Sequence, residues 1–244
     1  MKKMIALTCA LAAFATTATL PTIEGESATG FTAVTNLADG VKTMIAVPYQ
    51  ACVGGEIAVK DLVSTQGLAA VSTPDNADNA ARLFVLQGTS SVPVYNVYYL
   101  DSAKGWSTTN NPSEPMAASV TVGSGNAVFL VDPTADTAYI KGGLVTNDQN
   151  TVCSNGYNLV SAISTEVYNL GSLTFTTPTG AGKAKNADQI ILQDGKVIWY
   201  KTGEGWRYQG AAVTLSDVVI PAGAGFWYYN ASETPVVITP NNNN

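Results

Sequence analysis

A repeated pattern of strand-forming residues constrains the fold of this chain more than any other feature. The stretch "VTVGSGNAVFLVD" at 120–132 recurs as "VVIPAGAGFWYYN" at 218–230, an offset of 98 positions. The same offset pairs "TAYIKG" at 137–142 with "PVVITP" at 235–240. Self-similarity at a fixed spacing is the mark of a repeated structural unit. The sequence therefore predicts a tandem duplication.

Shorter matches keep the same order along the chain while the offset drifts between 98 and 114. They are "GW" at 105–106 and 205–206, "LFVLQ" at 83–87 with "QIILQ" at 189–193, "AVTN" at 33–36 with "LVTN" at 144–147, and "MIAVPYQ" at 44–50 with "NLVSAIS" at 158–164. We therefore expect two units, module 1 at 29–141 and module 2 at 142–240. A polar tail follows at 241–244.

The local pattern within each module predicts about six to eight short strands separated by turn residues. Charged residues make up only 12% of the chain, Thr, Val, Tyr and Gly are common, and no long stretch has helical periodicity. Asp194-Gly195 lies between two strand patterns and favours a two-residue type I′ hairpin turn. The predicted fold class is all-β, with two tandem antiparallel β-sandwich-like modules; open barrels are the less favoured alternative.

Residues 1–20 have the layout of a cleaved secretory signal, in which Lys2 and Lys3 precede an apolar, alanine-rich run that contains Cys9. We expect an exported protein, extracellular or at the cell surface, with the periplasm as the alternative. No later segment is long and apolar enough to span a bilayer. Removing Lys2 and Lys3 changes the formal charge from −6 to −8, so nucleic acid is not an expected partner.

Two cysteines follow the predicted signal, Cys52 and Cys153. In an oxidising compartment we expect a disulfide between them, which would close a loop of 101 positions. The chain-entropy treatment gives such a loop roughly 4–5 kcal/mol of stabilisation. The alternative is two buried free thiols.

Three stretches of module 2 together resemble a known kind of module. They are "GYNLVSAIS", "IILQDGKVIWYKTGEGWRYQG" and "VVIPAGAGFWYYN". In order, they resemble the "GWNLVGNPY … YxWNGxxY … IPAGQGFFV" pattern of uncharacterised β-modules in secreted bacterial surface proteins. Module 1 shows the pattern only in "MIAVPYQ" and "VTVGSGNAVFLV", and Ser161-Ala162 replaces the usual Gly-Asn. The resemblance implies a surface-displayed β-protein and carries no catalytic residues.

Little in the sequence points to catalysis. The absence of histidine excludes Ser-His-Asp and Cys-His hydrolysis and the usual zinc sites. A pair of carboxylates could still hydrolyse glycosides, but the acidic residues mostly flank turns. Asp75 and Asp78 in "TPDNADNA" are weak calcium candidates, because the alternating register of a calcium loop is missing. We expect no enzyme, no metal and no cofactor.

The aromatic residues of module 2 are the best candidates for function: Trp199, Trp206, Tyr208, Trp227 and Tyr229. Exposed rings of this kind stack on sugars, whereas buried ones fill a sandwich core. The run from Phe226 to Tyr229 makes both faces of its strand apolar, as do Val128 to Val131 in module 1. We therefore expect protein to cover both faces, through a long loop, the sister module or another subunit.

These observations favour a secreted, non-catalytic structural or adhesive protein that acts through display or assembly. Its expected partners are other surface or matrix proteins, or further copies of itself. The alternative is a carbohydrate-binding protein that holds a polysaccharide on the tryptophan and tyrosine side chains of module 2. Exposed, coplanar rings would favour this alternative, and burial of the rings would remove its main support.

Overall fold

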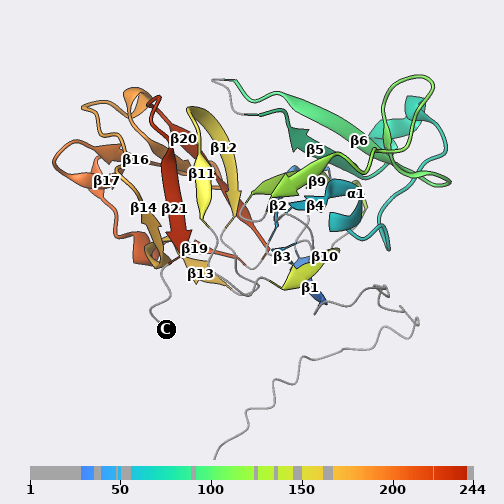
Figure 1. Ribbon diagram of the computed structural model, residues 1–244, viewed down its shortest axis with the longest axis horizontal. Coiled ribbons are helices and arrows are strands. Elements are labelled where there is room, and N and C mark those ends of the chain that lie inside the picture. Colours follow the sequence, from blue (N-terminus) through green and yellow to red (C-terminus); the bar gives the residue numbers. More distant parts are fainter. Residues whose placement is uncertain are drawn as a thin grey trace, which may run out of the picture.

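The computed structural model describes residues 29–35, 40–47, 49–50, 56–88, 92–123, 126–134, 137–144, 150–161, 167–221 and 223–240. The predicted signal at 1–20, Cys52 and the tail at 241–244 lie outside these ranges. The chain folds into several antiparallel sheets, which confirms the predicted all-β class. The described residues contain no helix with the length and apolar character needed to cross a membrane. Two β-rich bodies lie next to each other, module 2 on the left and module 1 on the right (Figure 1).

Module 1 is built on a five-stranded sheet with the order β2-β9-β5-β6-β7. Two smaller sheets, β1-β10-β3 and β4-β8, complete it. The strands are β1 (Thr29–Thr35), β2 (Thr43–Ala46), β3 (Tyr49–Gln50), β4 (Glu56–Ala58), β5 (Arg82–Leu86), β6 (Tyr95–Asp101), β7 (Gly105–Thr108), β8 (Thr121–Gly123), β9 (Ala127–Val131) and β10 (Thr137–Leu144). The helices are α1 (Val59–Leu62) and a 3-10 helix, η1 (Pro74–Asn79).

Module 2 is built on a six-stranded sheet with the order β12-β20-β15-β16-β17-β18, and on the smaller sheets β11-β21-β14 and β13-β19. The strands are β11 (Thr151–Cys153), β12 (Gly156–Ser161), β13 (Tyr168–Asn169), β14 (Leu173–Phe175), β15 (Gln189–Ile191), β16 (Val197–Lys201), β17 (Gly205–Tyr208), β18 (Ala211–Ala212), β19 (Val219–Ile220), β20 (Gly225–Asn230) and β21 (Val236–Pro240). Its 3-10 helices are η2 (Leu170–Ser172), η3 (Ala184–Asn186) and η4 (Leu215–Asp217).

The two modules share one strand order. The sheet β2-β9-β5-β6-β7 corresponds position by position to β12-β20-β15-β16-β17. The register agrees as well: Arg82 lies opposite Val131 and Tyr99, and Gln189 lies opposite Tyr229 and Trp199. The duplication itself stays a prediction, which this correspondence supports.

The register corrects three of the matches predicted from the sequence. The counterpart of Met44 is Leu159, and that of Leu83 is Ile190, each one residue away from the predicted partner. A slip of one residue would turn every side chain of a strand to the wrong face, so pairing is decided by burial and not by letter matches. The strand that contains "AVT" in module 1, β1, corresponds to β11 and not to residues 144–147.

The turn predicted at Asp194-Gly195 has a different geometry. The Gly195 N–H donates to the Leu192 carbonyl, and Leu192 pairs with Lys196 across a three-residue loop. Gly195 has a φ of +83°, which is the left-handed position of this longer hairpin type. A two-residue hairpin turn does occur at Gln209-Gly210, where both φ angles are positive (+47° and +85°) and Tyr208 pairs with Ala211.

Each module encloses its own apolar core on one face of its large sheet, which we call the core face. In module 1 this face carries Leu83, Trp106 and Leu130. In module 2 it carries Phe226 and Tyr228, both fully buried. The opposite side of each large sheet is called the outer face.

The outer faces meet in a third cluster that joins the two modules. Met44, Phe129, Leu159 and Trp227 pack together in it. The contacts are reciprocal, because β9 touches β12 and its counterpart β20 touches β2. A Cβ at Gly225 would lie 3.0 Å from the Ala127 side chain of module 1 and 2.7 Å from the Val160 carbonyl oxygen of its own sheet, so glycine permits the close approach of β20 to β9. The sister module therefore covers the second face of the aromatic run at Trp227 but not at Tyr229, and it is one of the three covers that the sequence analysis left open.

Candidate binding surface

A straight row of partly exposed side chains crosses the outer face of the module 2 sheet. We call it the outer row, and its members are Tyr157, Tyr229, Gln189, Trp199 and Arg207. Each lies directly opposite the next on adjacent strands, from β12 through β20, β15 and β16 to β17. Side chains in such register stand on the same side of a sheet. The outer row is therefore a single surface of three aromatic rings and two polar groups.

The inner end of the outer row continues into the module junction through ring contacts. The Tyr157 ring lies 4.8 Å from that of Tyr229 and 5.8 Å from that of Trp227. Trp227 in turn meets Phe129 at 5.7 Å and Tyr95 at 6.5 Å, both of module 1. Aromatic pairs at these separations add stability beyond their buried area. The junction therefore holds the inner end of the row in place.

The outer end of the row carries two cations that share one carboxylate. Lys201 and Arg207 both form ion pairs with Glu204. Hydrogen bonding from Lys201, with the charge of Arg207, lowers the pKa of the Glu204 carboxyl. Arg207 also donates to the Gly210 carbonyl, and it lies opposite Trp199 on the neighbouring strand. This end of the row has a net positive charge at neutral pH.

The same surface is closed in module 1. The counterparts of Trp199 and Arg207 are Tyr99 and Ser107, and both are completely buried. Ser113, from the loop after β7, hydrogen-bonds to the Tyr99 hydroxyl. Burial raises the pKa of this phenol. At these two positions the outer face of module 1 is thus occupied by the chain itself, whereas Trp199 and Arg207 of module 2 are partly exposed.

The structure divides the five aromatic residues that the sequence singled out. Trp199 and Tyr229 lie on the outer row, and Trp227 lies beside them in the junction. Trp206 and Tyr208 pack against the core of module 2 instead. Trp206 contacts Phe175 at 5.5 Å, which is a core position and not a place for a ligand. The five residues therefore do not form one coplanar platform.

Three members of the outer row escaped the sequence analysis: Tyr157, Gln189 and Arg207. They lie on three different strands and are joined only by cross-strand register. Alternation places Trp199 and Tyr200 on opposite faces of β16, and Trp206 and Arg207 on opposite faces of β17, but it does not relate the faces of the two strands. The pairing of Trp199 with Arg207 was not visible without the hairpin register.

Cys153 is a fully buried free thiol in the core of module 2, and the described residues contain no disulfide. Burial, together with the nearby charge of Asp188, raises the pKa of this thiol to about 12. Asp188 is itself buried and accepts hydrogen bonds from the Tyr228 hydroxyl and from the N–H groups of Thr179 and Ala231. Both groups are engaged in holding the core. Since Cys52 lies outside the described residues, the predicted Cys52–Cys153 bond stays a prediction without support.

The weak calcium candidates lie on a 3-10 helix, η1, where Asp78 pairs with Arg82. Asp75 is on the same helix, whose counterpart in module 2, η3, contains Lys185. Within the described ranges no three acidic or cysteine side chains gather as metal ligands would. Asp75 and Asp78 are thus explained as residues of an exposed helical turn.

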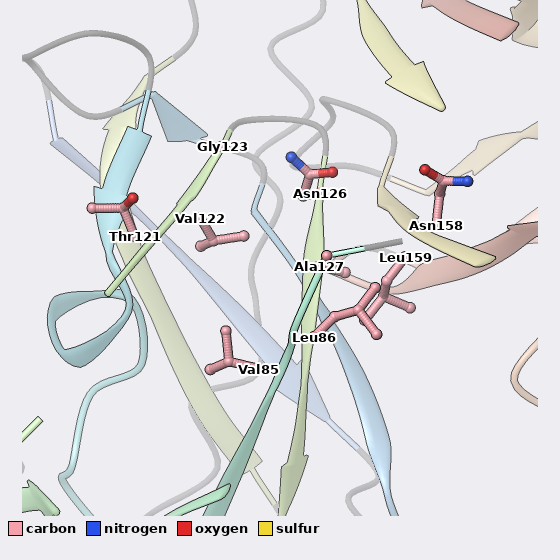
Figure 2. A pocket seen from close by; sticks show the side chains of 10 residues that line it. Val85, Leu86, Thr121, Val122, Gly123, Asn126, Ala127, Asn158 and Leu159 are labelled. Atoms are coloured by element: carbon pink, nitrogen blue, oxygen red, sulfur yellow. The ribbon is translucent and has the colours of Figure 1, made fainter. Parts of the chain in front are cut away.

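A small pocket opens beside the junction, with a volume of about 210 Å³. Leu86, Ala127 and Leu159 line its centre, with Asn126 and Asn158 above them (Figure 2). The Asn158 amide nitrogen already donates to the carbonyls of Ser154 and Gly156. Ligand pockets usually exceed about 300 Å³. The open outer row is therefore the better candidate for a large ligand.

Comparisons of the chain with protein-family models, with curated proteins and with solved structures found no match. The resemblance to secreted surface β-modules stays a prediction based on the quoted residues of module 2. The function of this chain must therefore be inferred from its own surface.

Proposed function

We propose that this chain is an exported, non-catalytic adhesive protein that binds polysaccharide on the outer row of module 2. One observation supports this function above all: the outer row presents Tyr157, Tyr229 and Trp199 in register on an open face. At three corresponding positions of module 1, Tyr99, Ser107 and Val131 are buried. A surface kept open in only one of two matched modules is the natural place for a ligand.

The spacing of the rings suits a sugar chain. Tyr229 and Trp199 lie on β20 and β16, which are separated by β15, so their Cα atoms are about 10 Å apart. This separation is comparable to the length of a disaccharide unit. Gln189 lies between the two rings and offers both donors and acceptors to hydroxyl groups. Stacking and hydrogen bonding therefore alternate along the row.

The sequence analysis favoured display or assembly over carbohydrate binding, because both faces of the β20 strand are apolar. At Trp227 the second face packs on Phe129 of module 1, as that expectation requires. The structure leaves the rings of Tyr229 and Trp199 outside the junction cluster. Adhesion through polysaccharide combines both expectations, since an adhesive protein displays its binding surface.

Binding to a panel of soluble polysaccharides, followed by intrinsic tryptophan fluorescence, tests this function. Trp199→Ala should weaken binding about tenfold, the ratio given by about 1.4 kcal/mol. The matched control is Tyr208→Ala, which removes a partly buried ring from the neighbouring strand on the core face. The control should bind normally. Equal binding by both variants, or no binding to any polysaccharide with the fold intact, would refute the proposal.

A further inference from the structure

We propose that the polysaccharide bound by the outer row is a linear acidic one that carries carboxylates. This inference rests on the proposed function and adds the charge of the ligand to it. It is carried by two groups of cations: Lys201 and Arg207 at the outer end of the row, and Lys42 of module 1 on the ring contacts that lead from its inner end. A chain with regularly spaced carboxylates complements this pattern.

The strands of the open face bear no negative charge. None of the outer-face residues of β12, β20, β15, β16 and β17 is acidic. The carboxylate of Glu204 lies in the turn after β16 and is shared by Lys201 and Arg207. Two cations and one anion leave a net charge of about +1 at this end. Arg207 keeps further N–H groups beyond its bonds to Glu204 and Gly210, because a guanidinium has five.

Lys42 supplies the second cation, at the junction end. Its ammonium group lies 4.1 Å from the centre of the Phe84 ring and 4.9 Å from that of Tyr95. Tyr95 contacts Trp227, which contacts Tyr157 at the inner end of the outer row. Within the described part of the chain, Lys42 has no acidic partner among the ion pairs. Its charge is therefore available to a ligand.

The chain as a whole is acidic, with a formal net charge of −6. At physiological ionic strength the Debye length is about 8 Å, so distant carboxylates act weakly on a ligand at the outer row. Local cations then decide the sign of the interaction. Arginine and lysine are also the usual hydrogen-bonding partners of carboxylates.

Matched pairs of polymers test the charge of the ligand. Polygalacturonate is compared with its methyl ester, carboxymethylcellulose with hydroxyethylcellulose, and dextran sulfate with dextran, at 0.15 M salt as a physiological value. The unmodified protein should bind at least one carboxylated polymer about tenfold more tightly than its neutral partner. Raising the salt concentration should reduce this difference.

Two charge-matched variants locate the effect. Arg207→Gln and Lys196→Gln both remove one positive charge, but Lys196 lies over the Tyr208 ring, away from the outer row. Arg207→Gln should weaken binding of the carboxylated polymer about fivefold and leave the neutral one unchanged. Lys196→Gln should change neither. If Arg207→Gln proves to unfold the protein, Lys42→Gln serves as the second variant with the same expected direction.

The outcomes separate this inference from the function on which it rests. Equal affinity for the charged and neutral members of the pairs would overturn the inference and leave polysaccharide binding in place. Preference for dextran sulfate alone would also overturn it, because the ligand would then be a sulfate ester. Equal losses in Arg207→Gln and Lys196→Gln would mean that net charge and not the outer row is responsible. Failure of all polymers to bind would overturn both proposals.

Discussion

Modules 1 and 2 use the same strand order but complete the outer face of the large sheet differently. In module 1, β7 is followed by residues 109–114, and Ser113 of this loop is buried on the Tyr99 hydroxyl. In module 2 the corresponding connection is the two-residue turn Gln209-Gly210. The short turn leaves Trp199 and Arg207 partly exposed. The length of one loop therefore separates a closed face from an open one.

The polar groups of the two faces are used differently as well. In module 1 the buried carboxylate of Asp101 accepts hydrogen bonds from the N–H groups of Ala103 and Lys104 and from the Tyr99 hydroxyl. The bond from Ala103, foremost, lowers the pKa of Asp101. Its counterpart in module 2 is Lys201, which reaches the surface. At this pair of positions, module 1 holds a carboxylate bonded inside the protein and module 2 holds an ammonium group at the surface.

The largest expected difference between the modules concerns the matched tryptophans. Trp106 is 3% exposed, whereas Trp206 is partly exposed. Trp106→Ala should lower the free energy of unfolding by about 3–5 kcal/mol, because a large cavity forms in a closed core. Trp206→Ala should lower it by roughly half as much. Urea denaturation compares the two, and equal losses would contradict the view that module 1 is the more closed.

The second largest loss of stability is expected from substitutions in the junction between the modules. Phe129→Ala removes a nearly buried ring and should reduce the free energy of unfolding by about 3 kcal/mol. Trp227→Ala, its counterpart, should reduce it by about 1–2 kcal/mol because part of that ring already faces solvent. Calorimetry should show the single unfolding transition dividing into two as the modules uncouple. One unchanged transition in both variants would mean that the junction does not couple them.

Alkaline pH should affect module 2 through Cys153. Its pKa is raised to about 12 in the folded state, so the folded protein keeps a proton that the unfolded chain loses above about pH 8.5. Stability should therefore fall by about 1.4 kcal/mol per pH unit above that value. Cys153→Val should abolish this slope.

Valine is the chosen replacement for Cys153 because the strand register places Val34 of module 1 at the equivalent position. Urea unfolding with a reductant at pH 8, 9 and 10 measures how the free energy of unfolding changes with pH in the unmodified protein and in Cys153→Val. The same slope in the variant would assign the effect to another group. Alkylation of the unreduced, unfolded protein gives a second check, since a Cys52–Cys153 disulfide would leave neither thiol reactive.

The smallest expected effect concerns the turn that keeps the face of module 2 open. Gln209 has a φ of +47°, a region that asparagine tolerates better than glutamine. Gln209→Asn creates the Asn-Gly pair preferred in type I′ turns and should raise the stability by about 0.5 kcal/mol. Thermal unfolding measures it. A lower midpoint would show that the Gln209 side chain supports the turn by contacts of its own.

Much of the framework followed from local patterns. The alternation of apolar residues predicted strands. The match of 120–132 with 218–230 aligned β9 with β20, which hold the same place in the strand orders of the two large sheets. The matches at Met44 and Leu83 were wrong by one residue, because letter similarity does not report which face of a strand is buried. The turn at Asp194-Gly195 was wrong for a similar reason, since Asp-Gly fits both two- and three-residue loops.

The candidate surface was predictable only in part. Trp199 and Tyr229 were named from their residue type, and so were Trp206 and Tyr208, which the structure places against the core. Residue type reports that a ring is large and apolar but not which neighbours surround it. Arg207 and Tyr157 belong to the outer row through strand pairs, which no short motif encodes.

By itself, the sequence determined the all-β class and the absence of histidine-dependent chemistry, because these depend on residue identity and spacing; the division into two duplicated modules stays a prediction. Only the tertiary structure decided which aromatic rings are open. That outcome depends on contacts between segments far apart in the chain, such as Phe129 with Trp227 and Ser113 with Tyr99. Burial is a property of such assembled neighbours, so the same kind of side chain is core in one module and surface in the other.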